Sequence, residues 1–229
     1  MAQLPLGIGL PDSAVFGTFH PGRNTSVAAA ARTAALGTGE PVLYLYGAQG
    51  SGKTHLLQAA CHAAHEGGRR AALLPLVQIA ELGIEAIEGW ELYDLVCVDD
   101  IHAIAGNREW EAALFTLFNA LRGRGGHWIA TGVDVPATLQ LTLPDLVSRL
   151  GAGPVFQLHE LDDEGRVLAL TLRASQRGLD MPAEVGQFLL KHLPRDMRTL
   201  YAALEVLDRA SLAQQRRLTV PFVKSVLGV

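Results

Sequence analysis

The chain has 229 residues, of which 49% are apolar, and its 19 basic and 23 acidic residues give a net charge of −4. The apolar content excludes a disordered chain. The charge balance argues against a domain that is basic throughout, as nucleic-acid-binding domains often are. No apolar run reaches the length of a membrane span, and the first ten residues lack the positive region of a signal peptide, so the expected location is the cytoplasm.

Apolar runs that favour strands alternate with helical patterns over the first 160 residues. The predicted strands cover residues 42–46, 71–76, 94–98, 127–131 and 154–158. The predicted helices cover residues 52–65, 77–86, 108–122 and 136–150. Because strands that alternate with helices are joined by right-handed crossovers, this order predicts an α/β domain with a parallel, doubly wound sheet.

Only helical patterns follow Asp162. Two apolar stripes at helical spacing comprise Val185, Phe188, Leu189 and Leu193, and then Met197, Leu200, Tyr201, Leu204 and Leu207. Pro194 separates the two helices, and Asp196 is placed as the N-cap of the second. A last short helix over 218–227 is entered through Pro221. The second part of the chain is therefore predicted to be a small helical domain.

Residues 47–54 read Gly-Ala-Gln-Gly-Ser-Gly-Lys-Thr, which matches the phosphate-binding pattern G-x-x-x-x-G-K-[ST] at every fixed position. Between a strand and a helix, such glycines let backbone N–H groups converge on a polyphosphate at the positive end of the helix. Lys53 would contact the β- and γ-phosphates, and the Thr54 hydroxyl would bind Mg²⁺. The alternative is a chance glycine-rich turn. The predicted nucleotide-binding residues of this stretch are Gly47, Gly50, Ser51, Gly52, Lys53, Thr54 and His55.

Two carboxylates, Asp99 and Asp100, end the apolar run at 95–98. Ligands of a doubly wound sheet bind outside the carboxyl ends of its strands, which predicts that both acids lie beside the phosphate loop. Asp99 would then hold Mg²⁺ through water, and Asp100 would orient or deprotonate an attacking water. The alternative is a pair of acids that cap a strand-to-helix turn.

The order of these motifs resembles that of the AAA+ ATPases, and their spelling resembles the DnaA initiator family. The residues that carry the resemblance are the phosphate loop, the Asp-Asp strand, Leu146-Val147-Ser148-Arg149-Leu150-Gly151, Asp196-Met197-Arg198-Thr199-Leu200 and Val15-Phe16-Gly17-Thr18-Phe19. The resemblance covers residue 15 to the end of the chain. It implies a flexible N-terminal segment over 1–14, an AAA+ P-loop α/β nucleotide-binding domain over 15–160 and an all-α lid domain over 161–229, with ADP or ATP and Mg²⁺ as ligands.

Arg149 resembles the arginine finger of that family, which points across a subunit interface at the γ-phosphate of a neighbour. Such a finger adds roughly 10³–10⁵ in rate by neutralising charge in the transition state. Without the resemblance, Arg149 would be interpreted as a solvated residue at a helix end.

Arg198 resembles the sensor II arginine of the lid, which contacts bound phosphate. It falls in the first turn of a predicted helix, off the buried face that begins at Met197. The competing interpretation is a salt bridge between the two domains.

One position departs from the pattern of the family. Members of the DnaA family usually carry an acidic sensor I residue where this chain has Val133, and Asp134 follows one place later. A valine cannot form a hydrogen bond to the attacking water or to the γ-phosphate. We therefore expect nucleotide binding but weak hydrolysis of the chain's own nucleotide.

The two ends of the chain complete the prediction. A DnaA initiator has a basic helix-turn-helix domain after its lid, whereas this chain ends at Val229, so no segment is expected to read a DNA sequence. Near the other end, Gln3, Leu4, Leu6 and Ile8 resemble the short peptides that bind the bacterial sliding clamp. The alternative is a loose start whose leucines fold back onto the core.

Together these features resemble the regulatory inactivators related to DnaA. The expected function is negative regulation of replication initiation: the nucleotide-bound protein docks on the DNA-loaded clamp (the beta subunit of DNA polymerase), and Arg149 stimulates ATP hydrolysis by DnaA. The expected partners are DnaA, the clamp and further copies of the chain, with DNA contacted only through the clamp and no membrane. Two alternatives remain: an autonomous ATPase resembling a helicase loader, with Asp100 as the base, and a scaffold that only bridges proteins.

Overall fold

The computed structural model describes residues 14–229, which form two compact units. The first unit contains residues 14–16, 26–46 and 53–157, and the second contains residues 17–25, 47–52 and 158–229. The predicted clamp-binding residues Gln3, Leu4, Leu6 and Ile8 lie outside the described part of the chain.

A five-stranded parallel sheet is the centre of the first unit. Its strands are β1 (Val42–Tyr46), β2 (Ala71–Pro75), β3 (Leu95–Asp99), β4 (His127–Gly132) and β5 (Val155–Gln157). They are ordered β2-β3-β4-β1-β5, so every strand is joined to the next in the chain by a crossover. β1, β3 and β4 are buried along almost their whole length because both faces of a parallel sheet are covered. The predicted parallel α/β fold is confirmed.

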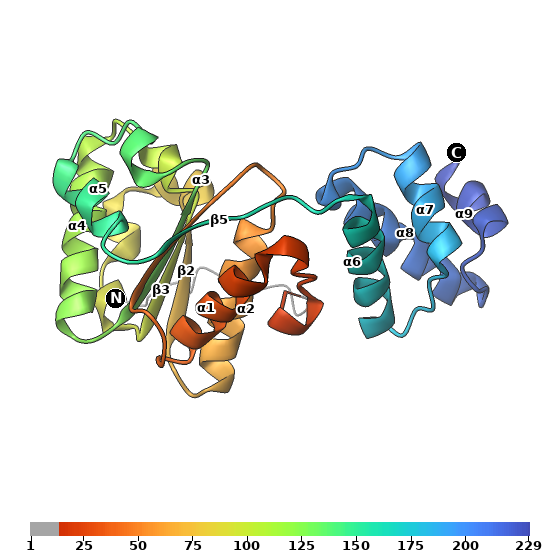
Figure 1. The fold of residues 1–229 in the computed structure, drawn as a ribbon, viewed down its shortest axis with the longest axis horizontal. Coiled ribbons are helices and arrows are strands. Elements are labelled where there is room, and N and C mark those ends of the chain that lie inside the picture. Colours follow the sequence, from red (N-terminus) through yellow and green to blue (C-terminus); the bar gives the residue numbers. More distant parts are fainter. Residues whose placement is uncertain (1–13) are drawn as a thin grey trace. The chain divides into compact units, whose positions relative to one another are not determined.

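Helices cover both faces of this sheet. They are α1 (Thr25–Ala35), α2 (Lys53–Glu66), α3 (Leu76–Ile79), α4 (Arg108–Gly123) and α5 (Pro144–Leu150). Figure 1 shows α4 and α5 on one side of the strands and α1 and α2 on the other. The α4 side is packed around Trp128 of β4, which is fully buried and meets the Phe118 ring edge-on at 5.4 Å.

The structure corrects two predicted helices of this unit. The helix predicted over 77–86 is a short α3 followed by 3₁₀ turns, because Gly83 adopts φ 87° and ψ 163° and interrupts the chain there. The helix predicted over 136–150 is only a 3₁₀ turn and then α5, since Gln140 has a left-handed conformation and Pro144 starts a new helix. The sequence prediction also missed α1.

Four helices make up most of the second unit: α6 (Asp163–Gln176), α7 (Ala183–His192), α8 (Met197–Gln214) and α9 (Val220–Leu227). Their apolar stripes meet in a core that includes Leu170, Val185, Leu189, Leu200, Leu204, Leu207 and Phe222. Asp196 is the N-cap of α8, because its Oδ1 accepts a 2.8 Å hydrogen bond from the Thr199 N–H, as predicted. The helical lid is therefore confirmed (Figure 1). No helix in residues 14–229 combines the length and the apolar character needed to cross a bilayer.

Candidate nucleotide site

The phosphate loop has a backbone conformation that requires glycine. Gly50 and Gly52 have φ values of 84° and 101°, which residues with a side chain rarely adopt. A Cβ at Gly52 would also lie 2.9 Å from the Phe19 ring, and one at Gly47 would lie 2.5 Å from the carbonyl oxygen of Leu158. The pattern therefore reflects a tight loop and not a chance run of glycines.

Asn24 holds together the two segments that flank this loop. Its side-chain amide donates to the carbonyl oxygen of His159 and accepts from the His159 N–H, both at 2.8 Å. Asn24 is buried, so these bonds satisfy a polar group that would otherwise be costly to bury. Phe19 and Leu158 are thereby fixed beside the loop.

Ser51 is the loop residue whose side chain most directly indicates a ligand. Its hydroxyl is buried and has no hydrogen-bond partner in the described part of the chain. A buried hydroxyl without a partner costs about 1–3 kcal/mol, whereas a phosphate oxygen would accept its hydrogen bond. The loop therefore fits a phosphate group.

Lys53 and Thr54 begin α2, directly after the loop. Lys53 is only 6% exposed. Burial lowers the pKa of its ammonium group, and the carboxylates of Asp100 and Asp99 offset part of that effect. A buried lysine near two carboxylates provides the positive charge that a polyphosphate with a divalent cation requires.

Asp99 is the centre of a hydrogen-bond network at the carboxyl end of β3. Its Oδ2 accepts from the Thr54 hydroxyl at 2.7 Å, and its Oδ1 accepts from the Thr131 hydroxyl at 2.6 Å. The carboxylate is 4% exposed and Thr131 is fully buried, so both are rigidly placed. A carboxylate and a hydroxyl are the oxygen ligands that Mg²⁺ prefers, and Thr54 with Asp99 fits that cation.

Asp100, which the sequence places beside Asp99, has an unusual backbone. Its φ of 55° and ψ of 53° are left-handed, and its N–H donates to the Thr131 hydroxyl at 2.9 Å. Burial and the neighbouring Asp99 raise the pKa of its carboxyl group, while His102 and Lys53 lower it. Residues with a strained backbone are common at functional sites.

Val133, the position that departs from the family pattern, directly follows β4. The Thr131 hydroxyl is used twice, as donor to Asp99 and as acceptor from Asp100. Val133 itself is 49% exposed. The carboxylate of the next residue, Asp134, accepts a 2.7 Å hydrogen bond from the Val135 N–H. The side chain at position 133 therefore offers no polar group that could hold a water for hydrolysis.

His55 has a contact that its sequence position did not reveal. Its Nε2 lies 3.1 Å from the carbonyl oxygen of Val15. This hydrogen bond links α2 to the segment that resembles the start of the ATPase core in the DnaA family.

Arg149 lies in the last turn of α5 and is exposed. Its guanidinium group sits 5.9 Å from the centroid of the Phe115 ring, on α4. Among the described residues it forms no ion pair. A cation–π contact orients the guanidinium group without neutralising it, so the charge stays available to a partner.

Arg198 lies in the first turn of α8 and is exposed. Hydrogen bonds from Thr199 lower the pKa of the neighbouring Asp196, and the charge of Arg198 adds to that effect. Within its own unit Arg198 forms no ion pair.

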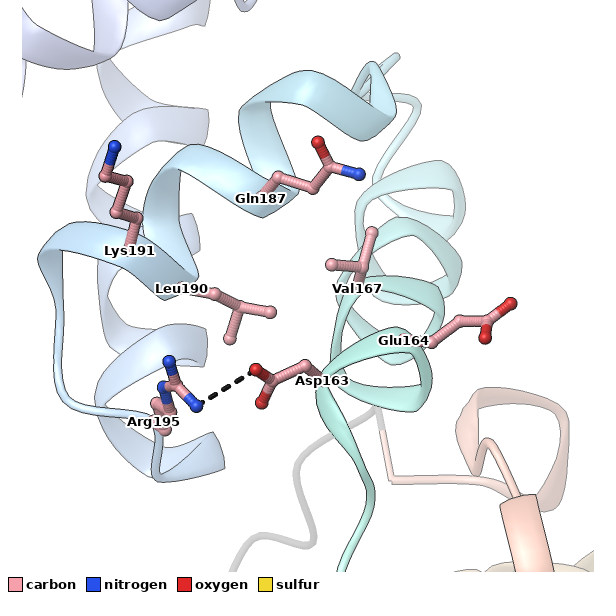
Figure 2. Close-up of a pocket in the computed structure, with 7 residues that line it drawn as sticks. All are labelled: Asp163, Glu164, Val167, Gln187, Leu190, Lys191 and Arg195. Carbon is pink, nitrogen blue, oxygen red and sulfur yellow. Dashed lines mark ion pairs between the residues drawn. The ribbon is translucent and has the colours of Figure 1, made fainter.

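A hollow of about 310 Å³ lies in the lid, between α6 and α7. Figure 2 shows Leu190 and Val167 at its centre, with charged side chains around them. Arg195 and Asp163 form an ion pair of 3.0 Å across one end. None of the predicted site residues lines this hollow, so it does not bear on the nucleotide chemistry.

Two family models match the chain. The lid domain of Hda matches residues 163–227, and the bacterial DnaA ATPase domain matches residues 10–77. Both the order of the two matches and the two units of the fold agree with a nucleotide-binding domain followed by a lid.

Solved structures share the fold at low sequence identity. Domain III of the replication initiation protein DnaA from Thermotoga maritima is 22% identical, with a TM-score of 0.77 over 95% of this chain and 97% of that one. DnaA from Aquifex aeolicus, bound to AMPPCP, is 24% identical, with a TM-score of 0.71 over 90% and 71%. The Holliday junction branch migration motor RuvB from Thermotoga maritima is 15% identical, with a TM-score of 0.59 over 89% and 66%. The chain therefore has the fold of DnaA domain III, with one segment similar to the bacterial DnaA ATPase domain and another similar to the lid domain of Hda.

Proposed function

We propose that this protein is a negative regulator of replication initiation that stimulates ATP hydrolysis by DnaA. The Hda lid, joined to a DnaA-type nucleotide domain, supports this class of function. The observation that carries the mechanism is Arg149: an exposed guanidinium group, oriented by Phe115 and without an ion pair in residues 14–229.

In this proposal Arg149 acts in trans. ATP-bound DnaA receives the guanidinium group at its γ-phosphate, where charge develops during hydrolysis. Because such a group adds roughly 10³–10⁵ in rate, one exposed arginine is sufficient to convert long-lived ATP–DnaA to ADP–DnaA.

The chain's own nucleotide has a structural role in this proposal. The phosphate loop, Lys53 and Arg198 bind the phosphates of ADP or ATP, and Thr54 with Asp99 holds Mg²⁺, which neutralises phosphate charge when bound. Val133 leaves position 133 without a polar side chain, which suits a nucleotide that is kept and not hydrolysed.

Gln3, Leu4, Leu6 and Ile8 dock the protein on the DNA-loaded clamp. Burial of the three apolar side chains contributes roughly 1.5–3 kcal/mol each. Ordering five or six residues costs about 1–2 kcal/mol each. Since these energies nearly cancel, hydrogen bonds from Gln3 and the main chain supply most of the net affinity. Retention then depends on several peptides engaging one multivalent clamp.

The test replaces Arg149 with Ala and measures hydrolysis of DnaA-bound ATP on DNA-loaded clamp. We expect a loss of at least 10³-fold with clamp binding unchanged. Arg32→Ala is the matched control, because Arg32 is also an exposed arginine, on α1. Full activity of Arg149→Ala would reject the finger and favour a scaffold that only bridges the clamp and DnaA.

A second candidate, an autonomous ATPase, is favoured by one observation. Asp100 lies beside Asp99 in a strained backbone conformation, and such strain is common at active sites, where a catalytic base is held in place. Rapid ATP turnover by the isolated protein, lost in Asp100→Ala, would support this motor. Slow turnover in both forms would support the regulator.

A further inference from the structure

Helix α4 contacts both ends of the element that carries Arg149. Glu111 and Phe115 are four residues apart and therefore share one face of α4. Phe115 lies under Arg149 at the end of α5, and Glu111 contacts the residues that lead into α5. Helix α4 therefore contacts both Arg149 and the residue from which α5 begins.

Glu111 joins three segments with one carboxylate. Its Oε1 accepts from the Gly106 N–H at 2.8 Å, before α4 begins. Its Oε2 accepts from the Thr142 hydroxyl at 2.9 Å and from the Leu143 N–H at 2.7 Å. Glu111 is fully buried, and a buried carboxylate is stable only when hydrogen bonds satisfy both oxygens.

The start of α5 depends on this carboxylate. Leu143 is the N-cap of the helix, but its side chain cannot accept the hydrogen bonds that a capping residue usually accepts. The Leu143 carbonyl accepts from the N–H groups of Leu146 and Val147 and so begins the first turn. The preceding segment is irregular, with Gln140 in a left-handed conformation. Glu111 therefore satisfies the N–H group of the N-cap residue, as the glutamate of a capping box does in other helices.

A shift at Leu143 is transmitted to Arg149. The two residues are separated by six positions of a single short helix, about 9 Å along its axis. A helix of seven residues has no internal hinge, so it moves as a rigid body when its start moves.

Electrostatics agree with this geometry. Burial raises the pKa of Glu111, but hydrogen bonds from Thr142, Gly106 and Leu143 outweigh it and hold the pKa below its ordinary value. The carboxylate is thus charged at neutral pH. Hydrogen bonds to a charged carboxylate are stronger than those to a neutral acceptor.

We propose that Glu111 is a positioning residue for Arg149: its carboxylate fixes the start of α5 and so sets the direction in which the guanidinium group is presented to a partner. This inference rests on the proposed function, because the reaction in question is hydrolysis of DnaA-bound ATP. Glu111 acts through α5 and does not touch the reacting atoms.

The test uses Glu111→Gln in the full chain. Glutamine has the same shape as glutamate, but an NH₂ group replaces one of the two oxygens. This NH₂ group cannot accept a hydrogen bond from the donor that it would face. We expect the maximal rate of DnaA-bound ATP hydrolysis to fall about 10- to 100-fold, since displacement of a catalytic group by about 1 Å costs up to that much. The DnaA concentration at half-maximal rate should stay within about twofold, because the guanidinium group acts on the transition state.

Thr142→Val is the milder variant and serves if Glu111→Gln does not fold. It removes one hydrogen bond to Glu111 and leaves the Leu143 bond in place. A smaller fall in maximal rate is expected. Amide hydrogen exchange should become faster at Leu143 and through residues 146–150 in both variants, and should be unchanged in β1, β4 and α8.

Arg69→Met is the matched control for a general loss of stability. Arg69 also ties several segments of the same unit together, donating to the carbonyl oxygens of Ala34, Ala35 and Asp94. At equal loss of melting temperature, Arg69→Met should keep the full maximal rate. An equal loss of rate in both variants, or an unchanged rate in Glu111→Gln, would overturn the positioning role.

The inference and the proposed function fail in different ways. If Arg149→Ala is inactive while Glu111→Gln is fully active, the finger stands and the positioning role is wrong. If Arg149→Ala is fully active, the proposed function is wrong and the positioning role falls with it. Adding Glu111→Gln to Arg149→Ala should lower the rate no further, because the two changes act through one guanidinium group.

Discussion

Three side-chain hydroxyl groups lie in the phosphate loop, at the start of α2 and at the end of β4, and their hydrogen bonding differs. Thr54 and Thr131 both donate to Asp99, so each oxygen of that carboxylate has a partner. Ser51 differs, because its buried hydroxyl has no partner in residues 14–229. The unpaired Ser51 hydroxyl therefore lowers the free energy of unfolding of the nucleotide-free protein, and a bound phosphate would supply the missing hydrogen-bond acceptor.

Ser51→Ala should separate stability from nucleotide binding. Removing the unpaired hydroxyl is expected to stabilise the nucleotide-free protein by about 1 kcal/mol. The affinity for ADP should fall by about 5- to 10-fold, since one hydrogen bond to the phosphate is lost. Thermal unfolding with and without ADP measures both effects. Ser175→Ala, an exposed serine of the lid, should change neither, and an unchanged ADP affinity in Ser51→Ala would contradict this assignment.

Whole elements depend on a few side chains at their ends. Glu111 fixes the start of α5, while Asp196 caps α8. Glu111 differs from Asp196 in being fully buried, so its hydrogen bonds are not screened by water. The free energy of unfolding should therefore depend on the charge of Glu111.

The pH dependence of stability tests this point. The pKa of Glu111 is lower in the folded chain than in the unfolded chain, where it is about 4.3. Its contribution is therefore fully present above that value and is lost as the pH falls through the folded pKa. Urea unfolding should show the wild-type protein about 1–3 kcal/mol more stable than Glu111→Gln at pH 7. This difference should shrink below about pH 4.

The exposed carboxylate of Glu88 provides the control for that experiment. Glu88→Gln and wild-type protein should give nearly parallel curves of stability against pH. A stability difference between wild type and Glu111→Gln that grows as the pH falls would be the opposite of the expected result.

The sequence predicted elements well where burial is uniform. β1 was predicted at its observed bounds, because a strand covered on both faces is apolar along its whole length. The helix predicted over 77–86 was wrong, since the apolar spacing continues through Gly83 while the backbone does not. α1 was missed because its buried face consists largely of alanines, although a run of alanines after Thr25 is itself a helix signal.

The candidate site was predictable only where one motif contains its residues. Residues 47–54 and the Asp99–Asp100 pair were found from local patterns. Thr131 and Glu111 were not, because each acts on groups more than 30 positions away that only the fold brings near. The unpaired hydroxyl of Ser51 likewise depends on burial, which the loop motif does not specify.

At the scale of the whole molecule, a DnaA-type nucleotide domain is joined to an Hda lid. The net charge of −4 gives no general attraction to DNA, which agrees with the proposal that the protein reaches DNA through the clamp. Under the same proposal, Arg149 would meet DnaA where the clamp retains both the protein and its substrate.

Leu4→Ala together with Leu6→Ala should abolish retention on the clamp. Each change removes roughly 1.5–3 kcal/mol of apolar burial, which a weak peptide cannot lose without releasing the clamp. Co-migration of the protein with DNA-loaded clamp measures retention. Nucleotide affinity serves as the control and should not change. Undiminished retention would show that these leucines are not the docking residues.

The most direct test of the central claim is the lifetime of ATP on DnaA in four mixtures. They contain this protein and DNA-loaded clamp together, each of the two alone, and neither. The account predicts rapid loss of the triphosphate only in the mixture that contains both. Equal lifetimes in all four mixtures would contradict it.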